Sequence, residues 1–134
     1  MIWRVLFWIE LILLAIPVTF LSSAFAVYAF GRAGMPEGHG NLVILFLATV
    51  GLIGFWALAG AYLSAGRSSL ARMHWSAWLA ATAGVFATLL GLAAEFLEVS
   101  TELRGLTWGI AGVPMLIPLA HLLAARFIAA SPQQ

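Results

Sequence analysis

The chain contains no cysteine, no lysine and no aspartate, and only 8% of its 134 residues are charged. The absence of cysteine excludes disulfides, thiolate metal sites and cysteine nucleophiles. With a formal net charge of +1, the sequence also lacks the basic surface that nucleic-acid binding requires. Hydrophobic residues make up 63% of the chain, against about 45–50% in soluble domains. We therefore expect a single membrane-embedded domain, residues 1–134, that binds no nucleic acid.

Four apolar stretches are each long enough to cross a bilayer as a helix, which needs roughly 20 residues. The connections between them, at 31–41, 64–74 and 95–105, are short, so neighbouring spans must run antiparallel. The sequence therefore predicts an all-α integral membrane protein, a four-helix up-down bundle without a soluble domain. The predicted spans are 5–30, 42–63, 75–94 and 106–125.

The arginines are distributed unequally between the two sides that this topology defines. The side with both termini and the second connection holds Arg4, Arg67, Arg72 and Arg126. Because cytoplasmic segments retain positive residues, we expect both termini in the cytoplasm and the spans in a bacterial inner membrane. The arginines of the second connection are expected to bind anionic headgroups of the lipid bilayer.

The first span also has features of a cleavable signal peptide. An arginine precedes the apolar run, and Ala24-Phe25-Ala26 resembles an A-x-A cleavage site. However, Glu10 interrupts the apolar run, which continues to Phe30 and is long for a signal peptide. These two features favour a retained membrane span.

Glu10 and His121 are the polar residues that we expect at membrane depth. At 1.5 Å per residue, Glu10 lies about 10 Å below Trp3, and His121 lies at a similar depth in the fourth span. The first and last helices of an up-down bundle usually adjoin, so we predict an intramembrane polar pair. Three interpretations are open. The pair can be a structural clasp between the two helices, or Glu10 can be protonated near the membrane interface. Alternatively, Glu10 can be a carboxylate that binds a proton or cation for transport.

Small residues follow one another at helical spacing in the third span, which we expect to be the packing centre. Such residues let helix backbones approach closely in lipid. The same faces can join the helices of this chain, or can bind a second copy or a partner's helix. The predicted helix-packing face contains Ala80, Ala83, Gly84, Ala87, Thr88 and Gly91. The second span adds a similar set, Ala57, Gly60, Ala61, Ser64 and Ala65.

Glu95, Glu98 and Glu102 share one face if the third helix continues past Ala94. This external acidic face is interpreted either as a solvated helix end or as a site for a cation or a basic partner. His39 and Glu37 are too few for a metal site, which needs three or four converging ligands.

The sequence indicates a function mainly through the residues that it lacks. The sequence contains no catalytic set and no paired deep histidines for haem, so we expect no enzyme and no cofactor. We predict a non-enzymatic protein that binds another membrane protein, as an accessory subunit or as an immunity-type protein against a membrane-targeting toxin. The alternative is a homo-oligomeric, proton-coupled transporter or channel in which Glu10 is the coupling carboxylate.

Overall fold

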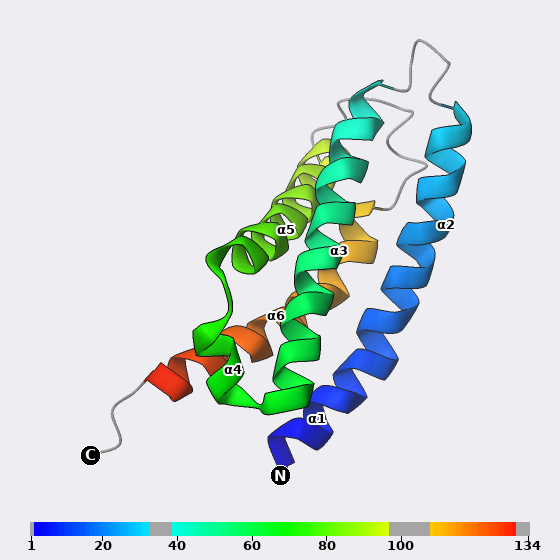
Figure 1. Cartoon of the computed structure of the whole chain (residues 1–134). Helices are drawn as coiled ribbons and strands as arrows, with labels where there is room; N and C mark the ends of the chain where they lie inside the picture. The colour runs from blue at the N-terminus through cyan, green and yellow to red at the C-terminus, as the bar shows by residue number, and fades with distance from the viewer. Residues whose placement is uncertain (1, 33–38, 97–107, 131–134) are drawn as a thin grey trace.

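The computed structural model describes residues 2–32, 39–96 and 108–130, and almost all of them are helical (Figure 1). The first helical segment contains a π-helical turn, η1, between two α-helical parts. The elements are α1 (Ile2–Glu10), η1 (Leu11–Ala15), α2 (Ile16–Arg32), α3 (His39–Ala65), α4 (Arg67–Arg72), α5 (Trp75–Phe96) and α6 (Trp108–Ala130).

Three of the described helices are long and apolar enough to cross a membrane. The qualifying segments are Ile2–Ala24, Leu42–Ala65 and Trp75–Ala93. In α6 the apolar segment is shorter, Gly112–Ile128. The predicted all-α class is therefore confirmed, and the three long helices indicate an integral membrane protein.

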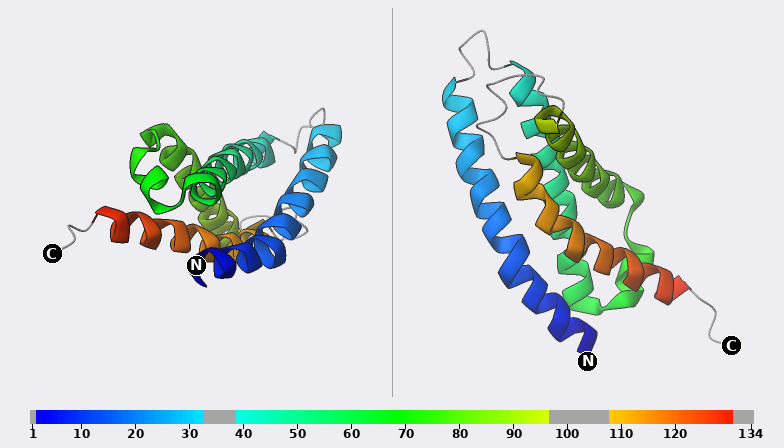
Figure 2. Two further views of the ribbon diagram at one scale, coloured as in Figure 1. Left: turned by 60° about the horizontal axis from the view of Figure 1, so that its bottom comes forward. Right: turned by 180° about the vertical axis from the view of Figure 1, so that it is seen from behind.

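The long helices run in alternating directions (Figure 1). α3 lies between α2 and α5, while α6 crosses α3 obliquely (Figure 2). The short helix α4 lies at the end of the molecule where α1 begins and α6 ends (Figure 1). This arrangement brings the first helical segment and the last helix into contact, since both α1 and η1 pack against α6.

The interface between α3 and α5 is built on glycine. A side chain at Gly51 would overlap the backbone of Gly84, and a Cβ at Gly84 would lie 2.9 Å from the Gly51 Cα. At Gly54 an added Cβ would lie 2.5 Å from the Ala81 backbone nitrogen and 2.6 Å from the Ala80 Cβ. Backbone contact of this kind maximises van der Waals attraction, the main force between helices in lipid.

The small residues predicted as a packing set in the second span do not form this interface. Ala57, Gly60, Ser64 and Ala65 are exposed, and no atom lies within 4 Å of a Cβ built at Gly60. The close contact with α5 uses Gly51 and Gly54 instead, where the backbones approach more closely. That the other small residues of α3 bind a second copy or a partner's helix stays a prediction. A further difference is α4, a short helix within the predicted second connection.

The tightly packed core occupies the half of the molecule nearest α4. Its members come from every helix except α2: Phe7, Leu11, Ala15, Phe55, Leu58, Ala59, Tyr62, Leu70, Ala81, Leu122 and Ala125. In the other half, α2 diverges from α3 (Figure 1). The two helices are joined by a hydrogen bond of 3.0 Å from Trp56 Nε1 to Thr19 Oγ1. The core therefore holds together the half in which Glu10 and His121 lie.

Candidate functional site

Glu10 is the last residue of α1, directly before the π-helical turn Leu11–Ala15. In this turn the Ile16 N–H donates to the Leu11 carbonyl, five residues back. Pro17 accounts for the change, because a proline has no N–H to donate to the carbonyl four residues earlier and its ring crowds that carbonyl. Single π-turns of this kind often occur at functional sites.

His121 belongs to α6 and meets Glu10 across the contact between the first and last helices. A hydrogen bond of 3.2 Å joins His121 Nδ1 and Glu10 Oε1, and Nδ1 also lies 3.1 Å from Oε2. Only 15% of the Glu10 side chain and 5% of the His121 side chain are exposed. The structure thus brings the two residues of the predicted polar pair together, away from the surface of the molecule.

Three aromatic rings surround the imidazole of His121. The ring centroids of Trp3, Phe7 and Tyr62 lie 5.3 Å, 5.2 Å and 6.0 Å from that of His121. Phe7 and Tyr62 also contact each other edge to face, at 5.0 Å. Apolar surroundings lower the local dielectric, which strengthens the hydrogen bond and raises the cost of leaving either partner unpaired.

Each member of the pair keeps one polar atom without a hydrogen bond. Among the described residues, neither His121 Nε2 nor Glu10 Oε2 has a hydrogen-bond partner, although both are buried. Oε2 is close to Nδ1 in distance but is not aligned with it. The pair can therefore hold a proton between two helices and has unused capacity for one more polar contact on each side.

Comparison of the chain with protein families, with curated proteins and with solved structures found no match. The case for a function therefore depends on the geometry of this chain.

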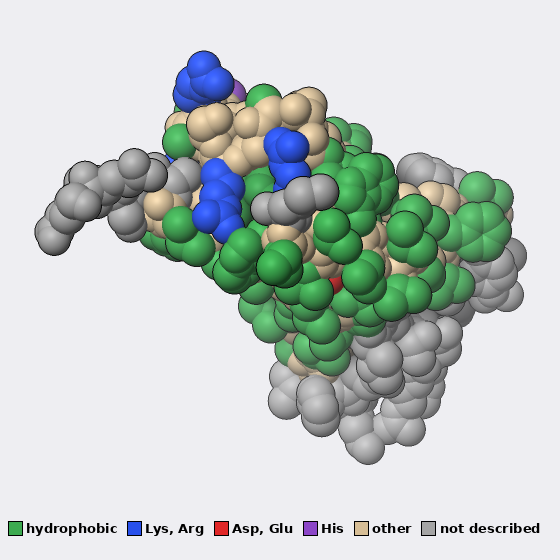
Figure 3. All heavy atoms as spheres, turned by 90° about the horizontal axis from the view of Figure 1, so that it is seen from below, with side chains coloured by type: hydrophobic (Ala, Val, Ile, Leu, Met, Phe, Trp, Pro, Cys, Tyr) green, Lys and Arg blue, Asp and Glu red, His purple; other side chains and the backbone are tan. Residues whose placement is uncertain are grey.

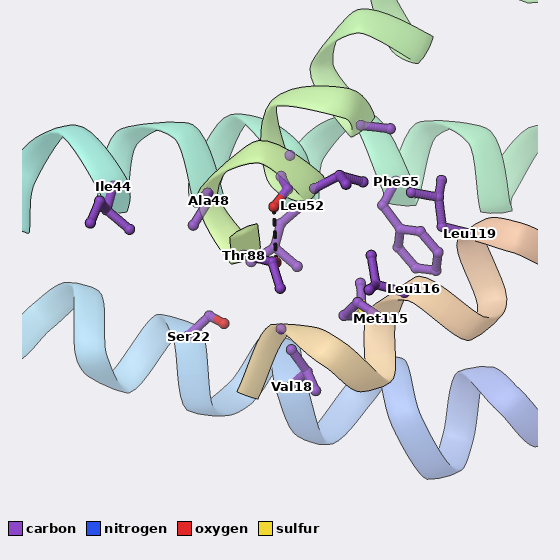
Figure 4. Close-up of a pocket in the computed structure, with 16 residues that line it drawn as sticks. Val18, Ser22, Ile44, Ala48, Leu52, Phe55, Thr88, Met115, Leu116 and Leu119 are labelled. Atoms are coloured by element: carbon purple, nitrogen blue, oxygen red, sulfur yellow. Dashed lines mark hydrogen bonds between the residues drawn. The ribbon is translucent and has the colours of Figure 1, made fainter. Parts of the chain in front are cut away.

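An apolar groove lies between α2 and the other long helices, in the half of the molecule away from α4. It encloses about 600 Å³ of space that no atom of the chain fills, part of it open to the surroundings. Figure 4 shows Val18 and Ser22 facing it from α2, and Ile44 and Ala48 facing it from α3. Neither Glu10 nor His121 lines this groove. The groove suits hydrocarbon and does not connect to the polar pair.

The predicted packing face of the third span lies on α5 and is used within the chain. Ala80 and Gly84 contact the glycines of α3, while Thr88 contacts Gly112 of α6. Ala87 is buried, and Ala83 and Gly91 are partly buried. These small residues therefore hold α3, α5 and α6 together.

The predicted external acidic face is only partly within the described residues. Glu95 lies in the last turn of α5, and Glu98 and Glu102 lie outside the described residues. Within the part of the chain that the structure describes, no three histidine or acidic side chains converge as metal ligands.

Sequence reasoning missed the π-helical turn and the aromatic rings around His121. The signal for the turn was Pro17, which lies within an otherwise regular apolar helix. The ring contacts had no local signal, because Tyr62 is more than fifty residues away from both Phe7 and His121.

Proposed function

We propose that this chain is a four-span protein of the bacterial inner membrane that binds another membrane protein. It would act as a non-enzymatic accessory subunit or as an immunity-type protein against a membrane-targeting toxin. In this proposal α6 is the fourth span and both termini are cytoplasmic. Arginines gather at the end of the molecule seen in Figure 3, and cytoplasmic segments retain such residues. They come from α1, α4 and α6: Arg4, Arg67, Arg72 and Arg126.

The observation that carries the proposal is a face of small residues on α3 that the described residues leave uncovered. Ala57, Gly60 and Ser64 are spaced by three and four residues, so they share one side of the helix. All three are exposed, and the space around Gly60 is open within 4 Å. A face of this kind lets a second transmembrane helix approach to backbone contact.

The polar pair supports binding over transport. Glu10 is hydrogen-bonded to His121, whose ring contacts Phe7, and the groove at which a transport pathway could begin does not reach Glu10. A carboxylate that joins the first and last helices stabilises a particular helix arrangement. A fixed arrangement of helices presents the exposed face of α3 to a partner in one orientation.

Gly60→Leu is expected to lower the amount of copurified partner at least about tenfold, which corresponds to about 1.4 kcal/mol of binding free energy. The leucine side chain would keep the backbone of α3 away from the backbone of the partner's helix. The measurement is affinity purification of the tagged full chain from native membranes, with stoichiometry determined by quantitative mass spectrometry. The thermal unfolding temperature of the purified variant should stay at the wild-type value.

The matched control is Ala24→Leu, which enlarges a small exposed residue on α2. It should leave partner recovery unchanged. Recovery of the same amount of partner with Gly60→Leu would contradict the proposal, and so would purification of wild type with only further copies of itself.

A second candidate function is proton-coupled transport or conduction by a homo-oligomer with Glu10 as the coupling residue. The observation that favours it is the buried, unbonded Glu10 Oε2 beside a π-helical turn. Intramembrane carboxylates and π-turns both occur at sites of ion movement.

For this candidate, Glu10→Gln should abolish proton uptake by proteoliposomes that contain a pH-sensitive dye and carry an imposed membrane potential. Glutamine keeps the shape of the side chain but cannot release a proton. His74→Gln is the control, because His74 is an exposed titratable residue away from the pair. Wild-type vesicles that take up protons no faster than protein-free vesicles would exclude this candidate.

A further inference from the structure

Arg4 and Arg67 come from distant parts of the chain and form what we call the crossed pair, at the end of the molecule where α1 begins. The Arg4 guanidinium packs on the turn between α3 and α4, with Nη2 3.0 Å from the position of a Cβ on Gly66. The Arg67 guanidinium lies over the ring of Trp3, 5.3 Å from its centroid. Each arginine therefore contacts the residue next to the other arginine in the sequence.

Neither guanidinium is neutralised within the described residues. Among the described residues, no carboxylate lies within 4.0 Å of either arginine, and the Glu10 carboxyl contacts His121 instead. Arg4 contacts Gly66, the residue directly before Arg67, so the two positive charges belong to one small region and repel each other when no counter-ion is present. An anion between them removes this repulsion, and the planar guanidinium matches the oxygens of phosphate in pairs.

The backbone that supports Arg4 is held rigidly. Gly66 has a φ of 77°, in the left-handed region that glycine adopts without strain. Its N–H donates to the Tyr62 carbonyl at 2.8 Å, and its own carbonyl accepts a hydrogen bond of 2.6 Å from Ser69 Oγ. Since Tyr62 is buried beside His121, this turn is anchored to the core of the molecule.

We propose that Arg4 and Arg67 bind the phosphate of an anionic phospholipid headgroup. Both lie at the end of apolar helices that are long enough to span a membrane, at the depth where headgroups begin. Trp3, which Arg67 covers, is the type of side chain that gathers at this boundary. The site is distinct from the partner-binding face of α3 and does not depend on it.

The test is calorimetric titration of the full chain in a neutral detergent with short-chain phosphatidylglycerol. Parallel titrations use short-chain phosphatidylcholine and inorganic phosphate. Wild type should bind phosphatidylglycerol at least about tenfold more tightly than either of the other probes. Arg4→Gln and Arg67→Gln should each weaken this binding about tenfold, and Arg67→Lys should weaken it less because the charge remains.

Arg72→Gln is the matched control, since it removes one positive charge from α4 at the same end of the molecule. It should leave the affinity within about twofold of wild type, because Arg72 is outside the crossed pair. An equal loss with Arg72→Gln would overturn the proposal in favour of unspecific surface charge. Equal affinity for inorganic phosphate would overturn the assignment to a lipid, and circular dichroism of each variant verifies that it is folded.

Discussion

Replacing Gly51 with valine is expected to lower the free energy of unfolding by about 3 kcal/mol, the upper part of the range for overpacked sites. The added side chain would overlap the backbone of Gly84 in the facing helix. Backbone atoms cannot rotate away as a flexible side chain can, so α3 and α5 must separate and lose contacts along their length. Unfolding of the purified chain in mixed micelles of increasing denaturing detergent, followed by circular dichroism, measures the change.

Gly60→Val on the same helix is the control for this prediction. It introduces the same side chain and the same change in helix propensity, at a position with no atom within 4 Å. Its effect on unfolding should be small or slightly favourable, since glycine is a poor helix former. Equal effects of the two substitutions would show that α3 does not pack through Gly51.

Replacing His121 with leucine is expected to destabilise the chain by about 2 kcal/mol, because the Glu10 carboxyl would remain buried without its partner. Within the described residues, His121 is the hydrogen-bond partner of the Glu10 carboxyl, and Glu10 Oε2 has none. Replacing Glu10 and His121 together should cost less than the sum of the single changes, since an apolar pair leaves no polar group unpaired. We expect a coupling energy of about 1–2 kcal/mol between the two positions.

A second cycle, with Glu10→Leu and His74→Leu, provides the control. His74 is exposed, and its Nδ1 lies 2.9 Å from the hydroxyl of Ser76. The two changes in this control cycle should be additive. Additive effects in the Glu10–His121 cycle as well would mean that the hydrogen bond contributes nothing to stability.

The two glycines and the polar pair join different helices of the molecule. Gly51 and Gly54 join α3 to α5, while Glu10 and His121 join the first helical segment to α6. The Glu10–His121 hydrogen bond lies beside the core residues Phe7 and Tyr62, whose rings contact His121. The apolar groove lies in the half of the molecule away from α4, where α2 diverges. Close packing therefore extends from the core residues to the Gly51–Gly84 contact, which lies beside the groove.

Prediction of the long helices from sequence succeeded because hydropathy is a local property. The predicted spans 42–63 and 75–94 fall within α3 and α5, and 5–30 falls within the segment formed by α1, η1 and α2. The helical rise of 1.5 Å per residue also predicted that Glu10 and His121 lie at similar depth. The structure joins the two residues by a hydrogen bond. The π-helical turn was not predicted, since its cause, Pro17, acts on hydrogen bonds several residues away.

The choice of packing faces shows what the sequence left open. α3 carries small residues on more than one side. The sequence pointed to the set with Ala57 and Gly60, for packing within the chain or for a partner's helix, whereas Gly51 and Gly54 make the close contact with α5. In water, an amphipathic pattern would distinguish the two sides. In lipid the solvent is as apolar as the interior, so both sides of such a helix look alike in sequence.

By itself, the sequence determined the helical class and the positions of the long apolar helices, and it predicted that Glu10 and His121 form a pair. Only the tertiary structure decided which glycines meet, which rings enclose His121 and which arginines cross. The physical reason is the separation along the chain of the residues that each property depends on. Helix formation and membrane partition follow from neighbouring residues, whereas the fit of one apolar helix against another depends on the shapes of surfaces brought together from distant parts of the chain.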